Sequence, residues 1–322
     1  MEDIEFFLEP TPPFRLDLTV WVLRRRPDNA WDRWDGEVYR RAMMLDDQPA
    51  EVAVTQTGPP TTPRLRVCAA ASRLPADAAA RVAAALERLL GLRADLTAFY
   101  ELASADPRLS RLAQTYRGVK PPRFLTLFET VVNAIACQQL TLTVGIRLLN
   151  RLSQRYGAAF PSTDATVHAF PLPQALAEAN VEDLLALGYS RQKALSVIEL
   201  ANAITGNGLH LECFRSLDDE AAQRELLQLR GIGRWTAEYV LLRGMGRLHV
   251  FPGDDVGARN NLRRWLRRSE PLDYEGVERL VRPWRPFAGL LYFHLLLDRL
   301  SEAGYLAASL TTSGPYQSNE AQ

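Results

Sequence analysis

The stretch LLQLRGIGRWTAEYVLLRGMGRLHVFPGDDVGARNN, residues 226–261, decides the fold of this chain. Apolar residues at helical spacing lead up to a Gly-Ile-Gly turn at 231–233, and the helical period resumes over 235–242. The pattern predicts two helices joined by a tight turn within residues 218–244. Glycine at both turn positions permits positive φ and leaves the backbone amides uncovered by Cβ atoms. Such a turn suits a phosphate oxygen, although Gly-x-Gly by itself is also an ordinary connection between helices.

Two adjacent carboxylates, Asp254 and Asp255, follow the hairpin after a Pro-Gly turn. An aspartate at this place is an ordinary helix N-cap, and that role suits one of the two. Residues 225–300 contain 13 Arg and no Lys against 9 acidic residues, a local excess of four positive charges, whereas the whole chain has a formal charge of +0. Positive charge therefore gathers where the hairpin would meet phosphates, while any single arginine suits a solvated helix face equally well.

The hairpin and the carboxylates occur together, in the order and at the spacing of a known signature that here runs from Gly233 to Asp255. They resemble the helix-hairpin-helix DNA glycosylase superfamily, in particular the 3-methyladenine DNA glycosylase II type. The segments FETVVNAIACQQLT (128–141) and GYSRQKALSVIELA (188–201) resemble it as well, so the likeness covers most of residues 93–300. The resemblance implies that Asp255 is the catalytic carboxylate, which stabilises positive charge on the sugar and orients or deprotonates water. In this interpretation Asp254 either caps the next helix or supports Asp255.

The residue two positions after the second hairpin glycine predicts the type of reaction. Superfamily members that also cut the strand carry a lysine there, because an amine must form a Schiff base with the sugar. This chain has Trp235 at that position, and its only lysines, Lys120 and Lys193, are expected to lie away from the motif. We therefore expect a monofunctional glycosylase that hydrolyses the base-sugar bond and leaves an abasic site.

Aromatic residues near the motif predict a pocket for a damaged base. An alkylated purine is cationic, and electron-rich aromatic faces attract cations. Trp235 and Tyr239 share one helix face, and the resemblance adds Phe293 as a further pocket aromatic. Core packing remains the alternative for each of these rings. Gln138 ends an apolar helix, so its amide either caps the core or faces the base pocket.

The resemblance also implies which residues touch DNA or a cation. Contact with the DNA backbone is expected at the hairpin, through Gly231, Ile232, Gly233, Arg234 and Thr236. A monovalent cation is expected at the main-chain carbonyls of Leu227, Leu229 and Ile232. A stiff linker with two prolines, RGVKPPR, suits a wedge that enters the base stack, and its candidates are Val119, Lys120 and Pro121. A plain connection between helices is the alternative for this linker.

The fold class that the resemblance implies is mostly α: a two-part helical helix-hairpin-helix glycosylase core preceded by a small α+β (TBP-like) N-terminal domain. Residues 1–92 resemble the small α+β (TBP-like) domain that precedes the helical part in the glycosylase II type, and residues 93–306 are expected to form an all-helical glycosylase domain. In the first part, alternating and β-branched residues predict strands over 14–23, 51–57 and 64–70. Alanine-rich sequence predicts a helix over 75–92. In the second part, helices are expected over 124–138, 141–156, 190–204 and 285–303. Residues 307–322 are expected to be a flexible tail.

Cysteine usage and the absence of targeting patterns limit the cofactors and the compartment. The three cysteines, Cys68, Cys137 and Cys213, are far apart and fit neither a disulfide framework nor a zinc site. Some relatives carry a four-cysteine iron-sulfur loop after the last helix, but this C-terminal region has no cysteine, so we expect no cluster and no required cofactor. No signal peptide or membrane-spanning run is visible. We expect a monomer without a membrane partner, in a bacterial cytoplasm and near the nucleoid.

Three functions remain open at this point. The first is a monofunctional glycosylase of base excision repair that flips out alkylated purines, of the 3-methyladenine and 7-methylguanine type, from double-stranded DNA. The second is a glycosylase for oxidised or deaminated bases. The third is a DNA-damage-binding protein without enzymatic activity, which the presence of Asp255 argues against.

Overall fold

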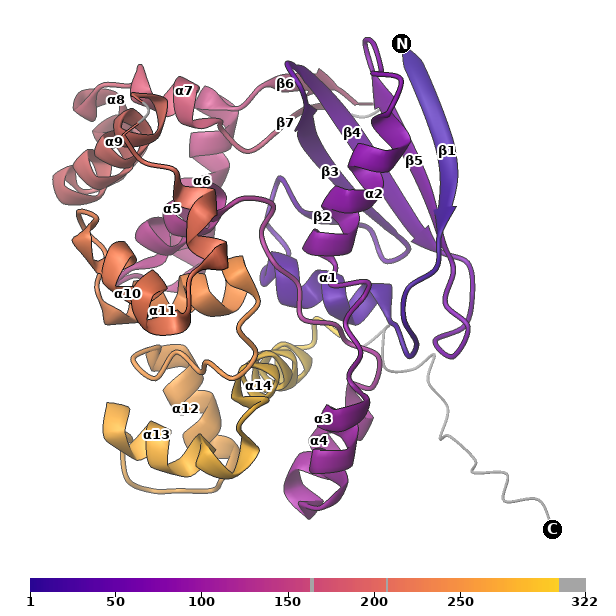
Figure 1. Cartoon of the computed structure of the whole chain (residues 1–322), viewed down its shortest axis with the longest axis vertical. Helices are drawn as coiled ribbons and strands as arrows, with labels where there is room; N and C mark the ends of the chain where they lie inside the picture. Colours follow the sequence, from indigo (N-terminus) through magenta and orange to yellow (C-terminus); the bar gives the residue numbers. More distant parts are fainter. Residues whose placement is uncertain (163–164, 207, 307–322) are drawn as a thin grey trace.

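A five-stranded antiparallel sheet begins the chain and helices make up most of the rest (Figure 1), as the sequence predicts. The computed structural model describes residues 1–162, 165–206 and 208–306. The predicted tail, 307–322, lies outside the described residues. In the order β1-β5-β4-β3-β2, the strands are β1 (Glu2–Leu8), β5 (Leu65–Ala71), β4 (Gln48–Gln56), β3 (Val38–Leu45) and β2 (Arg33–Trp34).

One face of this sheet is apolar and is covered by helix α2 (Ala78–Leu89), as Figure 1 shows. Side chains alternate between the faces of a strand, so Val52 and Val54 of β4 both point inward and lie opposite Ala69 and Val67 of β5. The strands predicted over 51–57 and 64–70 and the helix predicted over 75–92 are therefore confirmed.

The strand predicted over 14–23 is wrong, because this segment is helix α1 (Leu16–Arg24). Its residues are buried almost without interruption, so no polar face marks a helical period in the sequence. Leu16 and Val20 pack on the sheet side, whereas Leu18 and Val22 pack against the helical part of the chain. A helix buried on both faces loses the amphipathic signal from which helices are recognised.

The helical part is built around two cores, which matches the predicted two-part arrangement. The first core joins α5 (Leu127–Cys137), α6 (Leu142–Tyr156), α7 (Pro173–Ala177), α8 (Val181–Ala186), α9 (Arg191–Thr205), α10 (Asp219–Gln228) and α11 (Arg234–Val240), which continues into the π-helical segment η2 (Leu241–Met245). The second joins α3 (Thr97–Ser104), α4 (Pro107–Thr115), α12 (Val256–Trp265), α13 (Tyr274–Val281) and α14 (Ala288–Glu302). A small hairpin, β6 (Ala159–Pro161) and β7 (Thr166–His168), and two 3₁₀ turns, η1 (Leu211–Ser216) and η3 (Arg282–Trp284), complete the described elements.

A buried ion pair ties the sheet to the helical part. The Arg41 guanidinium on β3 donates to Asp32 at 2.8 Å and to both carboxylate oxygens of Glu129 on α5 at 2.7 Å. All three side chains are at most 3% exposed. Breaking a buried pair by removing one partner costs about 3–5 kcal/mol, so this cluster holds the two parts in one relative position. None of the described helices combines the length and the apolar composition that a membrane span requires.

Candidate active site

Asp255 lies at the start of α12, where α11 of the hairpin and α14, the last of the described helices, meet it. Its Oδ1 accepts the amide of Ala258 at 2.8 Å, which caps α12. Its Oδ2 accepts the indole N–H of Trp235 at 3.3 Å and the hydroxyl of Tyr292 at 3.2 Å. The carboxylate is therefore held at both oxygens, by three donors from three elements. Of the two adjacent aspartates, Asp255 is therefore the N-cap of α12.

Asp254 has a different partner and points away from this arrangement. Its Oδ2 accepts the Nε of Arg234 at 2.6 Å, and both side chains are partly exposed. Exposed pairs of this kind contribute about 0–1 kcal/mol. The prediction that Asp254 caps the next helix is therefore wrong, and its contact with the hairpin supports the turn from outside.

Tyr292 was missed by sequence reasoning, which selected its neighbour Phe293. Consecutive residues on a helix point about 100° apart, so only one of the two can face Asp255. Phe293 is 1% exposed, and the guanidinium of Arg243 lies 5.4 Å from its ring centroid. Its predicted place in the base pocket is therefore corrected. Burial raises the pKa of Tyr292 well above its ordinary value, and the charge of Asp255 adds to this, so the hydroxyl stays a donor.

Trp235 and Tyr239 form an aromatic layer beside Asp255, with ring centroids 5.4 Å apart. Trp235 is half-buried, whereas Tyr239 is only 3% exposed. The Tyr239 hydroxyl accepts from Arg25 at 2.9 Å and donates to Asn133 at 3.2 Å. Tyr239 is therefore the buried, fixed ring of the layer, and Trp235 lies nearer to solvent. Arg25 comes from the end of α1, so the N-terminal part contributes a charged group that we had not predicted.

Two buried cations lie behind the aromatic layer. The guanidinium of Arg243 lies 5.8 Å from the ring centroid of Tyr239 and donates to the carbonyl of Val22 at 2.9 Å. Burial lowers the pKa of Arg243, but arginine remains charged in proteins. Within the described part of the chain, neither Arg25 nor Arg243 forms an ion pair with a carboxylate. Their charge opposes the entry of a cationic base, whereas Asp255 favours it.

The two hairpin glycines have different roles, and only one of them uses the positive φ that glycine permits. Gly231 has φ +76°, and a Cβ there would lie 2.4 Å from the Ser196 hydroxyl. Gly233 has extended backbone, with φ −105° and ψ −178°, and a Cβ there would meet nothing within 4 Å. Gly231 therefore shapes the turn, while Gly233 leaves open space beside the first turn of α11, whose amides have no partners within the helix.

Gln138 braces the hairpin rather than the base pocket. Its amide nitrogen donates to the carbonyl of Gly231 at 2.8 Å and to the hydroxyl of Thr236 at 2.9 Å. Thr236 is 1% exposed and Ile232 is 8% exposed, so these two side chains are held inside the protein. Of the five residues predicted to contact DNA, only Gly231, Gly233 and Arg234 are exposed.

The predicted wedge residues do not reach the surface. Val119, Lys120 and Pro121 are all buried, because the linker runs between α1 and α3. The Lys120 ammonium donates to the carbonyl of Ala94 at 2.6 Å, and burial lowers its pKa to about 8. These three side chains therefore cannot enter a base stack from this position, and the wedge prediction is corrected.

An exposed apolar side chain does lie beside the hairpin. Leu140 is 43% exposed in the short loop between α5 and α6. It follows Gln139, whose φ of +53° is rare for a residue with a side chain, and it is two residues from the brace at Gln138. Leu140 is therefore an exposed apolar side chain near the hairpin, as are Leu227 on α10 and Val256 beside Asp255.

Lys193 is nearer to the motif than we had expected. Its ammonium donates to the carbonyls of Ala136 and Gln138, at 3.0 and 2.6 Å, and so caps the end of α5. This amine is occupied by two acceptors. Trp235, and not an amine, donates to Asp255.

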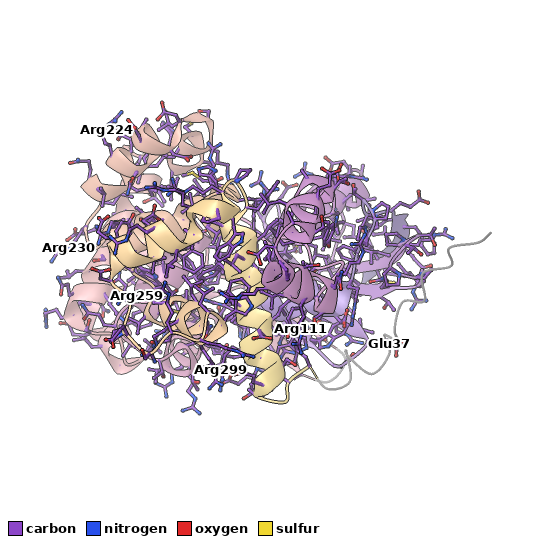
Figure 2. The ribbon with its side chains drawn as sticks, turned by 90° about the horizontal axis from the view of Figure 1, so that it is seen from below. Glu37, Arg111, Arg224, Arg230, Arg259 and Arg299 are labelled. Atoms are coloured by element: carbon purple, nitrogen blue, oxygen red, sulfur yellow. The ribbon has the colours of Figure 1, made fainter. Side chains whose placement is uncertain are left out.

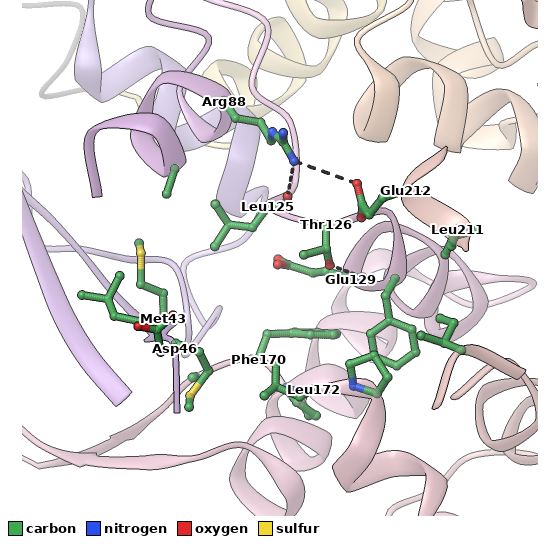
Figure 3. A pocket seen from close by; sticks show the side chains of 18 of the residues that line it. Met43, Asp46, Arg88, Leu125, Thr126, Glu129, Phe170, Leu172, Leu211 and Glu212 are labelled. Atoms are coloured by element: carbon green, nitrogen blue, oxygen red, sulfur yellow. Dashed lines mark hydrogen bonds and ion pairs between the residues drawn. The ribbon is translucent and has the colours of Figure 1, made fainter. Parts of the chain in front are cut away.

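The Asp255 site and the apolar pocket of the molecule lie in different places. Figure 2 shows Arg230 and Arg259 along the side formed by the hairpin and α12. The apolar pocket in Figure 3, about 660 Å³, lies elsewhere, between β3, α2 and the start of α5. Glu129 and Arg88 line it, but no residue of the Asp255 site does. That pocket lies between the sheet and the helical part, and none of the side chains that hold Asp255 contributes to it.

Comparison with known proteins agrees with this geometry. Residues 132–286 match the HhH-GPD superfamily base excision DNA repair protein family. The chain is 30% identical to DNA-3-methyladenine glycosylase 1 of Schizosaccharomyces pombe over 166 residues, which are 50% of this chain and 69% of that protein. It is 27% identical to a DNA-3-methyladenine glycosylase of Bacillus subtilis over 201 residues, 62% of this chain. The match spans 66% of the Bacillus protein, slightly less than two thirds.

A solved structure resembles nearly the whole described fold. The 3-methyladenine DNA glycosylase of Archaeoglobus fulgidus superimposes with a TM-score of 0.80 and 27% identity, over 92% of this chain and 98% of that one. The similarity thus includes the N-terminal sheet as well as the helices. Hairpin, carboxylate, sequence match and fold agree: the chain belongs to the HhH-GPD superfamily of base excision DNA repair proteins.

Proposed function

We propose that this protein is a monofunctional DNA N-glycosylase that releases alkylated purines from double-stranded DNA and leaves an abasic site. The observation that carries the proposal is the Asp255 carboxylate, which Trp235 and Tyr292 hold at the edge of the aromatic layer. The names of the similar proteins from Schizosaccharomyces pombe, Bacillus subtilis and Archaeoglobus fulgidus support the alkylated substrate.

The reaction begins with a base that has left the stack. A base-sugar bond inside a duplex cannot be reached, so the nucleotide rotates out at a cost of a few kcal/mol, which is smallest for damaged pairs. The hairpin amides near Gly233 bind the backbone of the strand, and Leu140 fills the gap that the base leaves. The flipped base stacks on Trp235, the more exposed of the two rings in the aromatic layer.

Hydrolysis then needs only the carboxylate and water. The bond from the sugar carbon to the base breaks, and its electron pair leaves with the base, which becomes neutral if it was alkylated. Asp255 stabilises the positive charge that develops on the sugar and accepts a proton from the attacking water. The two donors on Oδ2 keep the carboxylate in one orientation throughout. The indole at Trp235 forms no imine, so the DNA strand stays intact.

A second candidate substrate is a neutral damaged base. The two buried guanidiniums of Arg25 and Arg243 favour it, because they lower the affinity of the pocket for a cation. Asp255 lies in the same region and acts in the opposite direction. The relative rates on cationic and neutral lesions therefore measure which charge dominates.

The remaining features of the proposal concern the setting of the enzyme. We propose that it acts as a monomer, in a bacterial cytoplasm and at the nucleoid, because its substrate is chromosomal DNA. A monovalent cation would bind the main-chain carbonyls of Leu227, Leu229 and Ile232. The Leu229 carbonyl accepts the Ile232 amide at 3.2 Å and retains a second lone pair for such a cation.

A panel of duplexes tests the proposal. Each duplex carries one lesion, either 7-methylguanine, 3-methyladenine, hypoxanthine or 8-oxoguanine, and base release is measured before and after alkali. We expect release of the alkylated purines, strand breaks only after alkali, and no covalent complex with borohydride. Binding without release of any base would identify a damage-binding protein instead, and a trapped complex would contradict the monofunctional reaction.

A further inference from the structure

Glu238 is a buried carboxylate that reaches the turn carrying Asp255. It follows Trp235 by three residues on α11, so both side chains lie on the same face of that helix. Glu238 is 5% exposed. Its Oε2 accepts the backbone amide of Gly253 at 3.1 Å, and its Oε1 accepts the hydroxyl of Tyr274 at 2.8 Å.

Tyr274 closes the turn from the opposite side. A Cβ on Gly253 would lie 2.8 and 2.9 Å from two adjacent carbons of the Tyr274 ring, so one side of the ring leaves no room for a side chain at this position. The Arg234 guanidinium lies 3.7 Å from the centroid of the same ring and is also bound to Asp254. The turn is therefore held between α11 and α13 by two side chains of α11: Arg234 binds the Asp254 side chain, and Glu238 binds the turn backbone and the Tyr274 hydroxyl.

We propose that Glu238 is a positioning residue for base release: by holding the Gly253 amide it fixes the turn that presents Asp255 to Trp235 and Tyr292. This inference rests on the proposed function of Asp255. Within the turn, the Asp255 amide donates to the carbonyl of Pro252 at 3.0 Å, so a shift of Gly253 moves the catalytic residue directly.

The chemistry of the two contacts requires a carboxylate. Both partners of Glu238, an N–H and an O–H, are donors, and an ionised carboxylate accepts at both oxygens. A glutamine has a single acceptor oxygen, so its NH₂ group would face one of the donors. Burying a charge is unfavourable unless it is hydrogen-bonded, and these contacts supply that compensation.

The protonation of Glu238 falls near neutral pH. Burial raises its pKa to about 7, against the opposing effect of the Tyr274 and Gly253 hydrogen bonds. The other charged groups around it are Asp254 in the turn, which raises the pKa further, and Arg234 on α11, which lowers it. Protonation removes one acceptor, so Glu238 accepts both the Gly253 amide and the Tyr274 hydroxyl only above this pKa. Base release should therefore rise about tenfold from pH 6 to pH 8, as the ionised fraction does.

Single-turnover base release at saturating enzyme, measured from pH 5.5 to 9, tests the proposal. We expect Glu238→Gln to lower the rate at pH 8 by about tenfold and to remove the rise near pH 7, with duplex affinity unchanged. Tyr274→Phe removes a donor that favours the ionised form, so it should move the rise to higher pH. Glu275→Gln, on the exposed side of α13, is the matched control and should behave like the wild type. A rise that persists in Glu238→Gln would overturn the proposal.

A measurement without DNA separates this proposal from the proposed function. The amide resonance of Gly253, followed by NMR, should titrate with a midpoint near pH 7 in the wild type and stay constant in Glu238→Gln. If Gly253 titrates but no lesion is released at any pH, the proposed function fails and the contact stands. If lesions are released but Gly253 does not titrate, the role of Glu238 is refuted.

Discussion

Replacing Asp255 by asparagine removes the proposed catalytic charge with almost no change in volume. Asparagine is as good an N-cap as aspartate, so its carbonyl can still accept the Ala258 amide and α12 should still begin at Val256. The NH₂ group must then take the place of Oδ2, opposite the Trp235 N–H and the Tyr292 hydroxyl. The hydroxyl can rotate and accept, but the indole N–H can only donate.

The magnitude of each effect follows from these contacts. One donor without an acceptor costs about 1–3 kcal/mol of folding stability, which lowers the melting temperature by roughly 2–4 °C per kcal/mol. Loss of the carboxylate should slow base release far more, by roughly 100- to 10,000-fold, because both charge stabilisation and proton acceptance disappear. Binding should change little, since Asp255 faces the sugar and not the phosphates.

Three assays distinguish these outcomes. Single-turnover release of 7-methylguanine gives the chemical rate, fluorescence anisotropy with an abasic-analogue duplex gives affinity, and thermal melting gives stability. Asp254→Asn is the matched control, because it breaks only the partly exposed contact with Arg234 and should lose less activity. The reasoning is refuted if Asp255→Asn keeps near-normal release while Asp254→Asn loses it.

The other predictions test the hairpin, the aromatic layer and the loop beside it. Gly233→Ala places a Cβ in open space, so the melting temperature should be unchanged while duplex binding weakens. Gly231→Ala, at φ +76°, should lose about 1 kcal/mol or more of folding stability and melt at a lower temperature. Normal affinity of Gly233→Ala would remove the hairpin from the interface. Trp235→Ala should slow release of 7-methylguanine more than release of hypoxanthine, by about 1–2 kcal/mol in relative rate, and equal losses would make this ring a packing residue. Leu140→Ala should lower the rate of base release from a paired lesion in duplex DNA by about tenfold, but not from a lesion in single-stranded DNA. Equal effects on both substrates would contradict a role in filling the space that the flipped base leaves.

The local motifs could be predicted because they depend on short-range backbone preferences. The hairpin over 231–233 is visible from two glycines between helical periods, and the resemblance to the family motif selects Asp255 from the two carboxylates after the Pro-Gly turn. Helix α1 was misassigned for the opposite reason, since burial on both faces removes the contrast between polar and apolar positions. The wedge linker was likewise judged from its composition, which does not show that other elements cover it.

By itself, then, the sequence determined a sheet-containing N-terminal part followed by a mainly helical part, the hairpin, and the presence of Trp235 where related strand-cutting enzymes carry a lysine. Only the tertiary structure decided which side chains meet Asp255. Tyr292 is 37 residues away from it along the chain, and the contact between Arg25 and Tyr239 joins residues 214 apart. Such contacts depend on how α1, α11 and α14 pack, and packing angles follow from the whole core. A single sequence records which residues are available, but the direction in which each points is set by elements far away in the chain.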